Sequence, residues 1–226
     1  MKKVIHRAGT RGHSDHGWLD SYHTFSFADY HDPERIHFGA LRVLNDDTVA
    51  GGEGFGAHPH DNMEIVSIPL EGELRHQDSM GHTSVLRTGE IQVMTAGTGI
   101  IHSEFNNSPN RPVKFLQIWI FPDRHGLPTR YEEITLAPAR TNELRTLVAP
   151  EGNGSERTAW IHQSAWFHTL DLERNTYEYA MRRQGNGLYV FVLEGDVTVE
   201  NEKLAPRDGM GIWEQNDITL HTDGKA

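Results

Sequence analysis

Gly52-Glu53-Gly54-Phe55-Gly56-Ala57-His58-Pro59-His60 is the stretch that decides the fold of this chain. It is a glycine-rich turn that runs into two histidines placed two residues apart. A short polar segment follows, and then an apolar run of strand length, residues 65–70, which a Glu-Gly pair closes. Turn residues on both sides of short apolar runs predict consecutive strands joined by tight turns. We therefore place both histidines on a strand.

A second stretch of the same kind ends in His102-Ser103-Glu104. Residues 89–104 again predict a strand, a glycine turn and a strand. Residues two apart on a strand point to the same side, with Cβ atoms roughly 6 to 7 Å apart. Each stretch thus presents a pair of potential ligands on one face. Two such pairs facing one another would form a cage of His58, His60, His102 and Glu104.

Three imidazoles and a carboxylate suit divalent iron, nickel, copper, manganese, cobalt or zinc. Four protein ligands leave about two positions of an octahedron open for chemistry. In a chain with 15 histidines, a single His-x-His pair is more often a surface or loop feature than a metal site. The strand-and-turn context of both pairs favours the metal site. We expect one divalent ion per chain, with Fe(II) as the first candidate.

The spacing of these residues resembles a known family. Gly-x5-His-x-His-x3-Glu-x7-Gly, followed by Gly-x5-Thr-Ala-Gly-x4-His-x-Glu, is similar to the two halves of the cupin metal signature as pirins carry it. Residues 12–21, 23–27 and 97–104 match bacterial pirin-like proteins closely, and the resemblance runs from about Lys3 to the C-terminus. It implies an all-β fold of two cupin-type β-barrels (jelly-roll, bicupin) packed together. The expected division is a metal-binding module at 1–131 and a second module at 132–226, with elements that interlock.

An internal repeat supports two related modules. Residues 65–74 have a counterpart in residues 188–197, and residues 88–93 are echoed by residues 207–213. Counting from these shared turns gives the residues that stand where the second module would need its ligands. They are Met181, Arg183, Thr222 and Gly224. None of them completes a metal cage, so we predict that the C-terminal module has no metal site.

Composition narrows the class of protein further. The chain has 226 residues, no cysteine and a formal net charge of −11. The absence of cysteine excludes disulfides, thiolate catalysis and cysteine-held metals. The negative charge argues against direct binding of nucleic acid, which depends on clustered Lys and Arg. There is no apolar run long enough to cross a membrane and no secretory signal, so we expect a cytoplasmic protein.

Glu64 is the ambiguous carboxylate of the first stretch. It stands where the general cupin pattern has a ligand, whereas in pirin-like proteins the carboxylate ligand resembles Glu104 in position. We choose Glu104 as the ligand and assign Glu64 the role of orienting a metal-bound histidine. We expect structural hydrogen bonds, or else a place in a pocket, for His13, His16 and His23. We expect no ligand role for His76, His82, His125, His162 and His168, and a pocket lining that includes Met94, Gln117 and Trp119. Residues 129–134 are expected to form a strand that crosses between the modules, and residues 138–145 a short helix.

The resemblance also implies an activity. Bacterial pirin-like proteins cleave the flavonol quercetin with dioxygen, open its heterocyclic ring and release carbon monoxide. The implied ligands here are a small aromatic substrate and O2, and Glu104 is the residue expected to take the hydroxyl proton. The alternative is a non-enzymatic regulatory protein that uses the same metal site and binds a protein partner. The motif alone does not separate the two functions, because both keep the same four ligands.

Overall fold

The computed structural model describes residues 1–226 and contains almost no helix. Strands make up the regular structure, and a single 3-10 turn lies at Ala8–Thr10. The all-β expectation is therefore confirmed. The short helix expected at residues 138–145 is wrong: the segment contains no helix, Asn142 lies in a turn with a φ angle of +63°, and the last residues begin the strand β13 (Leu144–Pro150).

The chain forms two compact units, each made from separated segments. The N-terminal unit contains residues 12–137 and 147–167. The C-terminal unit contains residues 1–11, 138–146 and 168–226. The units differ from the expected division at residues 131 and 132 because the first strand of the chain, β1 (Lys2–His6), pairs with β20 (Gly209–Trp213) near the end of the chain.

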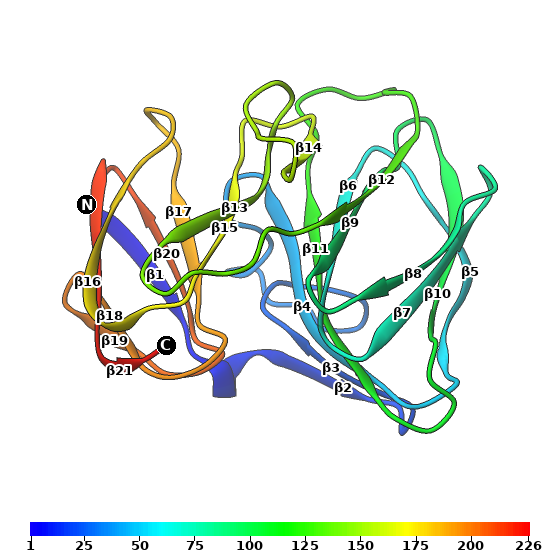
Figure 1. Ribbon diagram of the computed structural model, residues 1–226, viewed down its shortest axis with the longest axis horizontal. Helices are drawn as coiled ribbons and strands as arrows, with labels where there is room; N and C mark the ends of the chain where they lie inside the picture. Colours follow the sequence, from blue (N-terminus) through cyan, green and yellow to red (C-terminus); the bar gives the residue numbers. More distant parts are fainter. The chain divides into compact units, whose positions relative to one another are not determined.

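Two antiparallel sheets build the N-terminal unit, and Figure 1 labels their strands. The larger sheet has the order β12-β9-β6-β11-β4-β3-β2, and the smaller one has the order β5-β10-β7-β8. The strands of the larger sheet are β2 (Gly12–Asp15), β3 (Leu19–His23), β4 (Leu41–Val49), β6 (Glu64–Glu71), β9 (Glu90–Thr95), β11 (Val113–Ile120) and β12 (Arg130–Thr135). Those of the smaller sheet are β5 (Gly54–His60), β7 (Glu73–Asp78), β8 (Thr83–Arg87) and β10 (Ile100–Asn106).

The core of this unit lies between the two sheets, because strands of both sheets contribute to one apolar cluster. Leu74 and Leu86 come from the smaller sheet, and Val113 and Phe115 come from the larger one. All four are at most 1 % exposed. Along β7 buried and exposed residues alternate, as expected for a strand with one face in a core. The segment expected to cross between modules, β12, instead pairs with β9 within this unit.

The C-terminal unit also has a four-stranded and a smaller sheet. They have the orders β16-β21-β18-β19 and β1-β20-β17. The strands not yet located are β16 (Glu173–Ala180), β17 (Leu188–Phe191), β18 (Val197–Val199), β19 (Glu202–Leu204) and β21 (Asp217–Lys225). The remaining two strands of the chain are β14 (Ala159–Ile161), which runs parallel to β13, and β15 (Phe167–Leu170).

The repeat read from the sequence is a structural repeat, since β5-β10-β7-β8 and β16-β21-β18-β19 follow the same plan. In both units the Glu-Gly pair forms the turn that leads into the third strand of this order, β7 or β18. Gly72 and Gly195 adopt φ angles of +83° and +67° there. A Cβ atom at Gly72 would lie 2.9 Å from the carbonyl oxygen of Pro112, so both the backbone angle and the space require glycine.

Strand pairing beyond these turns fixes which residues correspond. The fourth residue after the glycine is His76 in the N-terminal unit and Val199 in the C-terminal unit. His76 pairs with Glu104, and Val199 pairs with Leu220. Leu220 is therefore the structural equivalent of Glu104.

The same pairing locates the equivalents of the three histidines. His102 lies two residues before Glu104 and is opposite His58, while Ile218 lies two residues before Leu220 and is opposite Tyr179. The equivalents of His58, His60, His102 and Glu104 are Tyr179, Met181, Ile218 and Leu220, in that order.

This register corrects the one counted along the sequence. Counting placed Met181, Arg183, Thr222 and Gly224 at the four positions, which is two residues late for the first pair and four residues late for the second. Both the connections and the strands differ in length. Residues 181–187 replace 61–63 before β17, which has four residues where β6 has eight. Residues 214–216 replace 96–99 before the last strand, and β20 has five residues and begins at Gly209, whereas β9 has six and begins after Gly89. Counting across loops of unequal length cannot preserve a register.

Candidate metal centre

The candidate ligands lie on two neighbouring antiparallel strands, β5 and β10. His102 is directly opposite His58, and Ile100 is opposite His60. The register shifts at a β-bulge between His102 and Glu104. The extra residue lies on β5, between Phe55 and His58. Strand β10 itself stays regular: His102 and Glu104 pair with Asp78 and His76 of β7, and both are buried, as the alternation along the strand predicts.

Three of the four predicted residues converge. The ring centroids of His58, His60 and His102 lie 4.5 to 4.8 Å from one another. One ligating atom from each lies within 4.8 Å of the others. His58 Nε2 and His102 Nε2 are 3.0 Å apart, which is about the separation of two nitrogens bound at roughly 2.1 Å on adjacent positions of one ion.

The tautomer of His58 also fits a metal ligand. Its Nδ1 lies 2.7 Å from the carbonyl oxygen of Gly56, which can only accept a hydrogen bond. Nδ1 therefore carries the proton, and the lone pair of Nε2 points toward the other two rings. Metal-bound histidines ordinarily have their second ring nitrogen held in this way. The histidine donor set therefore fits a divalent ion.

Burial and neighbouring histidines lower the pKa of two of these side chains, His60 and His102. Burial, followed by the neighbouring histidines His102 and His58, lowers the pKa of His60 to about 4. Burial and then His58 and His76 lower the pKa of His102 to about 3. Neutral imidazole is the form that binds a metal, so these side chains need not release a proton near neutral pH.

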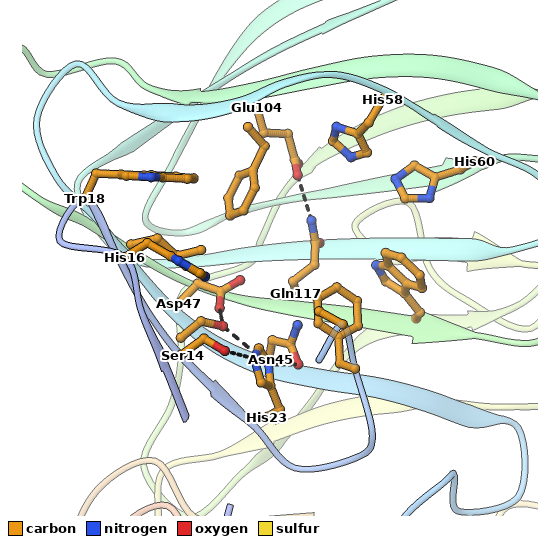
Figure 2. Close-up of a pocket in the computed structure, with 16 residues that line it drawn as sticks. Ser14, His16, Trp18, His23, Asn45, Asp47, His58, His60, Glu104 and Gln117 are labelled. Carbon is orange, nitrogen blue, oxygen red and sulfur yellow. Dashed lines mark hydrogen bonds between the residues drawn. The ribbon is translucent and has the colours of Figure 1, made fainter. Parts of the chain in front are cut away.

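Glu104 is buried beside the histidines but is held by other groups. Gln117 Nε2 donates to one carboxylate oxygen at 2.7 Å, as Figure 2 shows. Ser67 Oγ and Gln92 Nε2 lie 3.1 and 3.3 Å from the other oxygen. Glu104 lies beside the three-histidine group through His102, since ligating atoms of these two residues are within 4.8 Å of each other.

His76 is a neighbour of the centre that sequence reasoning missed. His76, His102 and Glu104 form a second, fully buried group whose ligating atoms lie within 4.8 Å of one another. His76 Nε2 is 3.3 Å from Asp78, and its Nδ1 is buried without a partner. Its spacing along the chain gives no signal, because it reaches the centre by pairing across strands with Glu104.

Glu64 does not orient a metal-bound histidine. One of its carboxylate oxygens accepts a hydrogen bond from Thr95 Oγ1 at 2.8 Å. The other lies 2.8 Å from His162 Nδ1 and 3.2 Å from the main-chain nitrogen of His162. Glu64 is completely buried and fastens residue 162 to the larger sheet. The role that we assigned to it from the sequence was wrong.

A cavity of about 370 Å³ is lined by His58, His60 and Glu104. This lies within the range of roughly 300–1,000 Å³ that is usual for small-molecule sites. Gln117 and Trp119 line it, as expected, whereas Met94 is buried in an apolar cluster and does not. The alternative pocket role holds for His16 and His23, while His13 makes a surface contact with Asp20.

Comparison with known proteins relates both halves of the chain to pirins and quercetinases. The family model described as Pirin matches residues 4–120, and the model described as Quercetinase C-terminal cupin domain matches residues 146–226. A curated relative from Escherichia coli named quercetin 2,3-dioxygenase is 41 % identical over 98 % of this chain and 94 % of its own length.

Solved structures extend this likeness to the whole fold. The crystal structure of YhhW from Escherichia coli has a TM-score of 0.92 and 38 % identity, covering 99 % of this chain and 94 % of that one. A second structure, described as the bacterial pirin YhhW in complex with nickel(II), also has a TM-score of 0.92 and 38 % identity, covering 99 % and 95 % of the two chains. Two cupin domains are therefore present. No helix in the chain has the length and apolar character needed to span a membrane.

Proposed function

Because this chain belongs to the pirin family, we propose that it is a metal-dependent dioxygenase that cleaves a flavonol such as quercetin with O2 and releases carbon monoxide. The observation that carries the proposal is the convergence of His58, His60 and His102 into one group, of which His58 and His60 line a cavity large enough for a small molecule. The relative named quercetin 2,3-dioxygenase supports the same reaction class.

His58, His60 and His102 would hold the ion, and Glu104 would be the fourth ligand after release from Gln117. When bound, a divalent ion supplies Lewis acidity and open coordination positions. Fe(II) remains our first candidate, and the nickel(II) complex of a pirin makes nickel the second. Nitrogen and oxygen ligands accept either metal.

Glu104 is the residue placed to take the proton of the flavonol hydroxyl group. It is a buried carboxylate with a ligating oxygen within 4.8 Å of His102, and its three present partners all donate to it. Gln117 also lines the cavity and can keep the carboxylate oriented toward the substrate. Apolar side chains around the cavity exclude water from the reacting centre, and these are Trp18, Leu19, Phe27, Phe55 and Trp119.

The deciding experiment is anaerobic loading with Fe(II) or Ni(II), followed by measurement of oxygen uptake and carbon monoxide release with and without quercetin. We expect quercetin-dependent uptake with stoichiometric carbon monoxide. His125→Ala is the matched control, since His125 is an exposed histidine of the same unit that is not part of either metal-binding group. A metal-loaded protein that consumes no oxygen with quercetin would instead favour the regulatory alternative.

A further inference from the structure

The wall of the cavity across from the histidines is polar and buried. Ser21, His23, Asn45 and Asp47 all line the cavity, and each is at most 4 % exposed. They come from β3 and β4 of the larger sheet. In Figure 2 His58 and His60 lie on one side of the cavity and Asn45, Asp47 and His23 lie on the other, with Gln117 between them. A metal centre does not require this second polar group.

A chain of hydrogen bonds fixes the orientation of these side chains. Ser21 Oγ donates a short hydrogen bond to Asp47 Oδ1. His23 Nδ1 lies 3.0 Å from Asn45 Oδ1, an atom that can only accept, so Nδ1 carries the proton. His23 Nε2 is then the acceptor for Ser14 Oγ, 3.3 Å away. Each group has one defined role.

Two polar groups remain free after these bonds are made. The amide nitrogen of Asn45 and the second carboxylate oxygen of Asp47 have no partner in the protein. The two residues are two apart on β4, so they face the same side of the strand, and both side chains point into the cavity in Figure 2. The cavity therefore presents a hydrogen-bond donor and an acceptor side by side.

Asp47 is costly to bury in this way. Burial, together with the smaller effects of its neighbours Asp46, Glu104 and Asp20, raises the pKa of Asp47 to about 7. Only the hydrogen bond from Ser21 opposes them. A buried acid without a cationic partner is typical of a functional position rather than of a structural one.

We propose that Asn45 and Asp47 form a subsite that binds the phenolic hydroxyl groups of the substrate ring remote from the metal, and so select a polyphenol over an unsubstituted aromatic ring. A phenolic hydroxyl donates and accepts one hydrogen bond each, which matches the free oxygen of Asp47 and the free amide of Asn45. The aromatic side chains Phe27, Phe55 and Trp119 also line the cavity, and they provide the apolar surface that the central rings of such a ligand require. This inference rests on the proposed function.

The test compares the affinities of two flavonols, quercetin and 3-hydroxyflavone, which lacks every hydroxyl group except the one at position 3. Binding is measured without oxygen on the Zn(II)-loaded protein, because zinc does not undergo redox chemistry. Wild type should bind quercetin roughly tenfold or more tightly than 3-hydroxyflavone. Flavonols hydroxylated on only one of the outer rings then identify the ring that occupies the subsite.

Asp47→Asn should weaken the binding of quercetin about tenfold and leave the binding of 3-hydroxyflavone unchanged. Asn45→Ala should change the two affinities in the same direction. Asp46→Asn is the matched control, since it makes the same change on the opposite face of the same strand. Metal content and thermal unfolding are measured for every variant, so that a folding defect is recognised.

The outcomes separate this inference from the proposed function. Equal weakening of both ligands by Asp47→Asn, or a wild type that does not distinguish them, overturns the inference alone. If Asp47→Asn selectively weakens quercetin binding but the iron-loaded wild type takes up no oxygen with quercetin, the inference is supported and the dioxygenase proposal is overturned. If neither flavonol binds to wild type, both are wrong.

Discussion

The strand pairs β5–β10 and β16–β21 occupy equivalent positions in the two units, but the first pair has polar side chains at positions where the second has mostly apolar ones. Where the first pair has His58, His60, His102 and Glu104, the second has Tyr179, Met181, Ile218 and Leu220. Ile218 is completely buried at the centre of an apolar cluster, and Met181 and Leu220 pack against it. The same scaffold thus carries a polar centre beside a cavity in one unit and a packed core in the other.

The difference shows what a metal centre costs the fold. Side chains at these positions of the C-terminal unit contribute apolar burial, worth about 1.5 to 3 kcal/mol for each large residue. In the N-terminal unit the same positions hold three imidazoles and a buried carboxylate, whose polar atoms need hydrogen bonds or a ligand. We therefore expect substitutions at these positions of the N-terminal unit to affect metal binding and activity, and substitutions at the equivalent positions of the C-terminal unit to affect the free energy of unfolding.

The largest effect should follow from removing a histidine of the centre. In His58→Ala or His102→Ala, we expect the bound metal to fall from about one ion per chain to less than a tenth, because two imidazoles remain and the geometry is lost. Metal analysis of purified protein measures this. Tyr179→Phe, the change at the position equivalent to His58, should leave the metal content unaltered. An undiminished metal content in both histidine variants would contradict the role of His58 and His102 as metal ligands.

Replacing Glu104 by Gln should have the next largest effect. The change keeps the size of the side chain but removes its charge and basicity, and general-base groups contribute about 10²- to 10⁴-fold to rates. We expect quercetin turnover to fall at least 100-fold, with the fold retained. Circular dichroism and oxygen uptake check the two parts of this prediction. Full activity in Glu104→Gln would exclude its role as the base.

Ile218→Ala should show the reverse profile. Shortening a fully buried isoleucine removes apolar contacts and leaves a cavity, which costs about 2 to 5 kcal/mol of unfolding free energy. Metal content should stay at the wild-type level. Urea unfolding combined with metal analysis tests both statements. A variant that lost its metal while the N-terminal unit stayed folded would contradict the separation of roles.

The smallest effect concerns pH and stability at Asp47. Its native pKa of about 7 lies above its ordinary value of 3.8, so the native state binds the proton more tightly than the unfolded state. The stability that it contributes is complete below about pH 4 and is lost as pH rises to 7. Asp47→Asn removes this dependence and should be more stable than wild type at pH 8, by about 1 to 3 kcal/mol.

Unfolding experiments at several pH values measure that difference. The gap between Asp47→Asn and wild type should close as the pH approaches 4, because the carboxyl group is then protonated in both states. A variant that gains stability at pH 8 while losing affinity for a polyphenol would mark Asp47 as a residue kept for binding. If the difference in unfolding free energy between Asp47→Asn and wild type does not change between pH 4 and 8, the pKa of Asp47 is not raised in the native state.

Local features of the sequence determined the all-β fold, the duplicated plan and the shared face of the candidate histidine ligands. Residues two apart on a strand share a face, and glycine is required where the backbone turns with positive φ, so both signals can be read within a few residues. That is why the shared face of His58 and His60 is predictable from the sequence alone, and why the Glu-Gly turns reveal the repeat.

Only the tertiary structure decided the rest, because it depends on pairing between distant segments. Hydrogen bonds from Ser67, Gln92 and Gln117 fix the carboxylate of Glu104. His76 reaches the centre across strands, and Glu64 binds His162 instead. Loops of unequal length shift the register of the repeat, and β1 joins a strand near the other end of the chain. No local periodicity encodes such contacts, since loop lengths and bulges set them independently of the pattern within each strand.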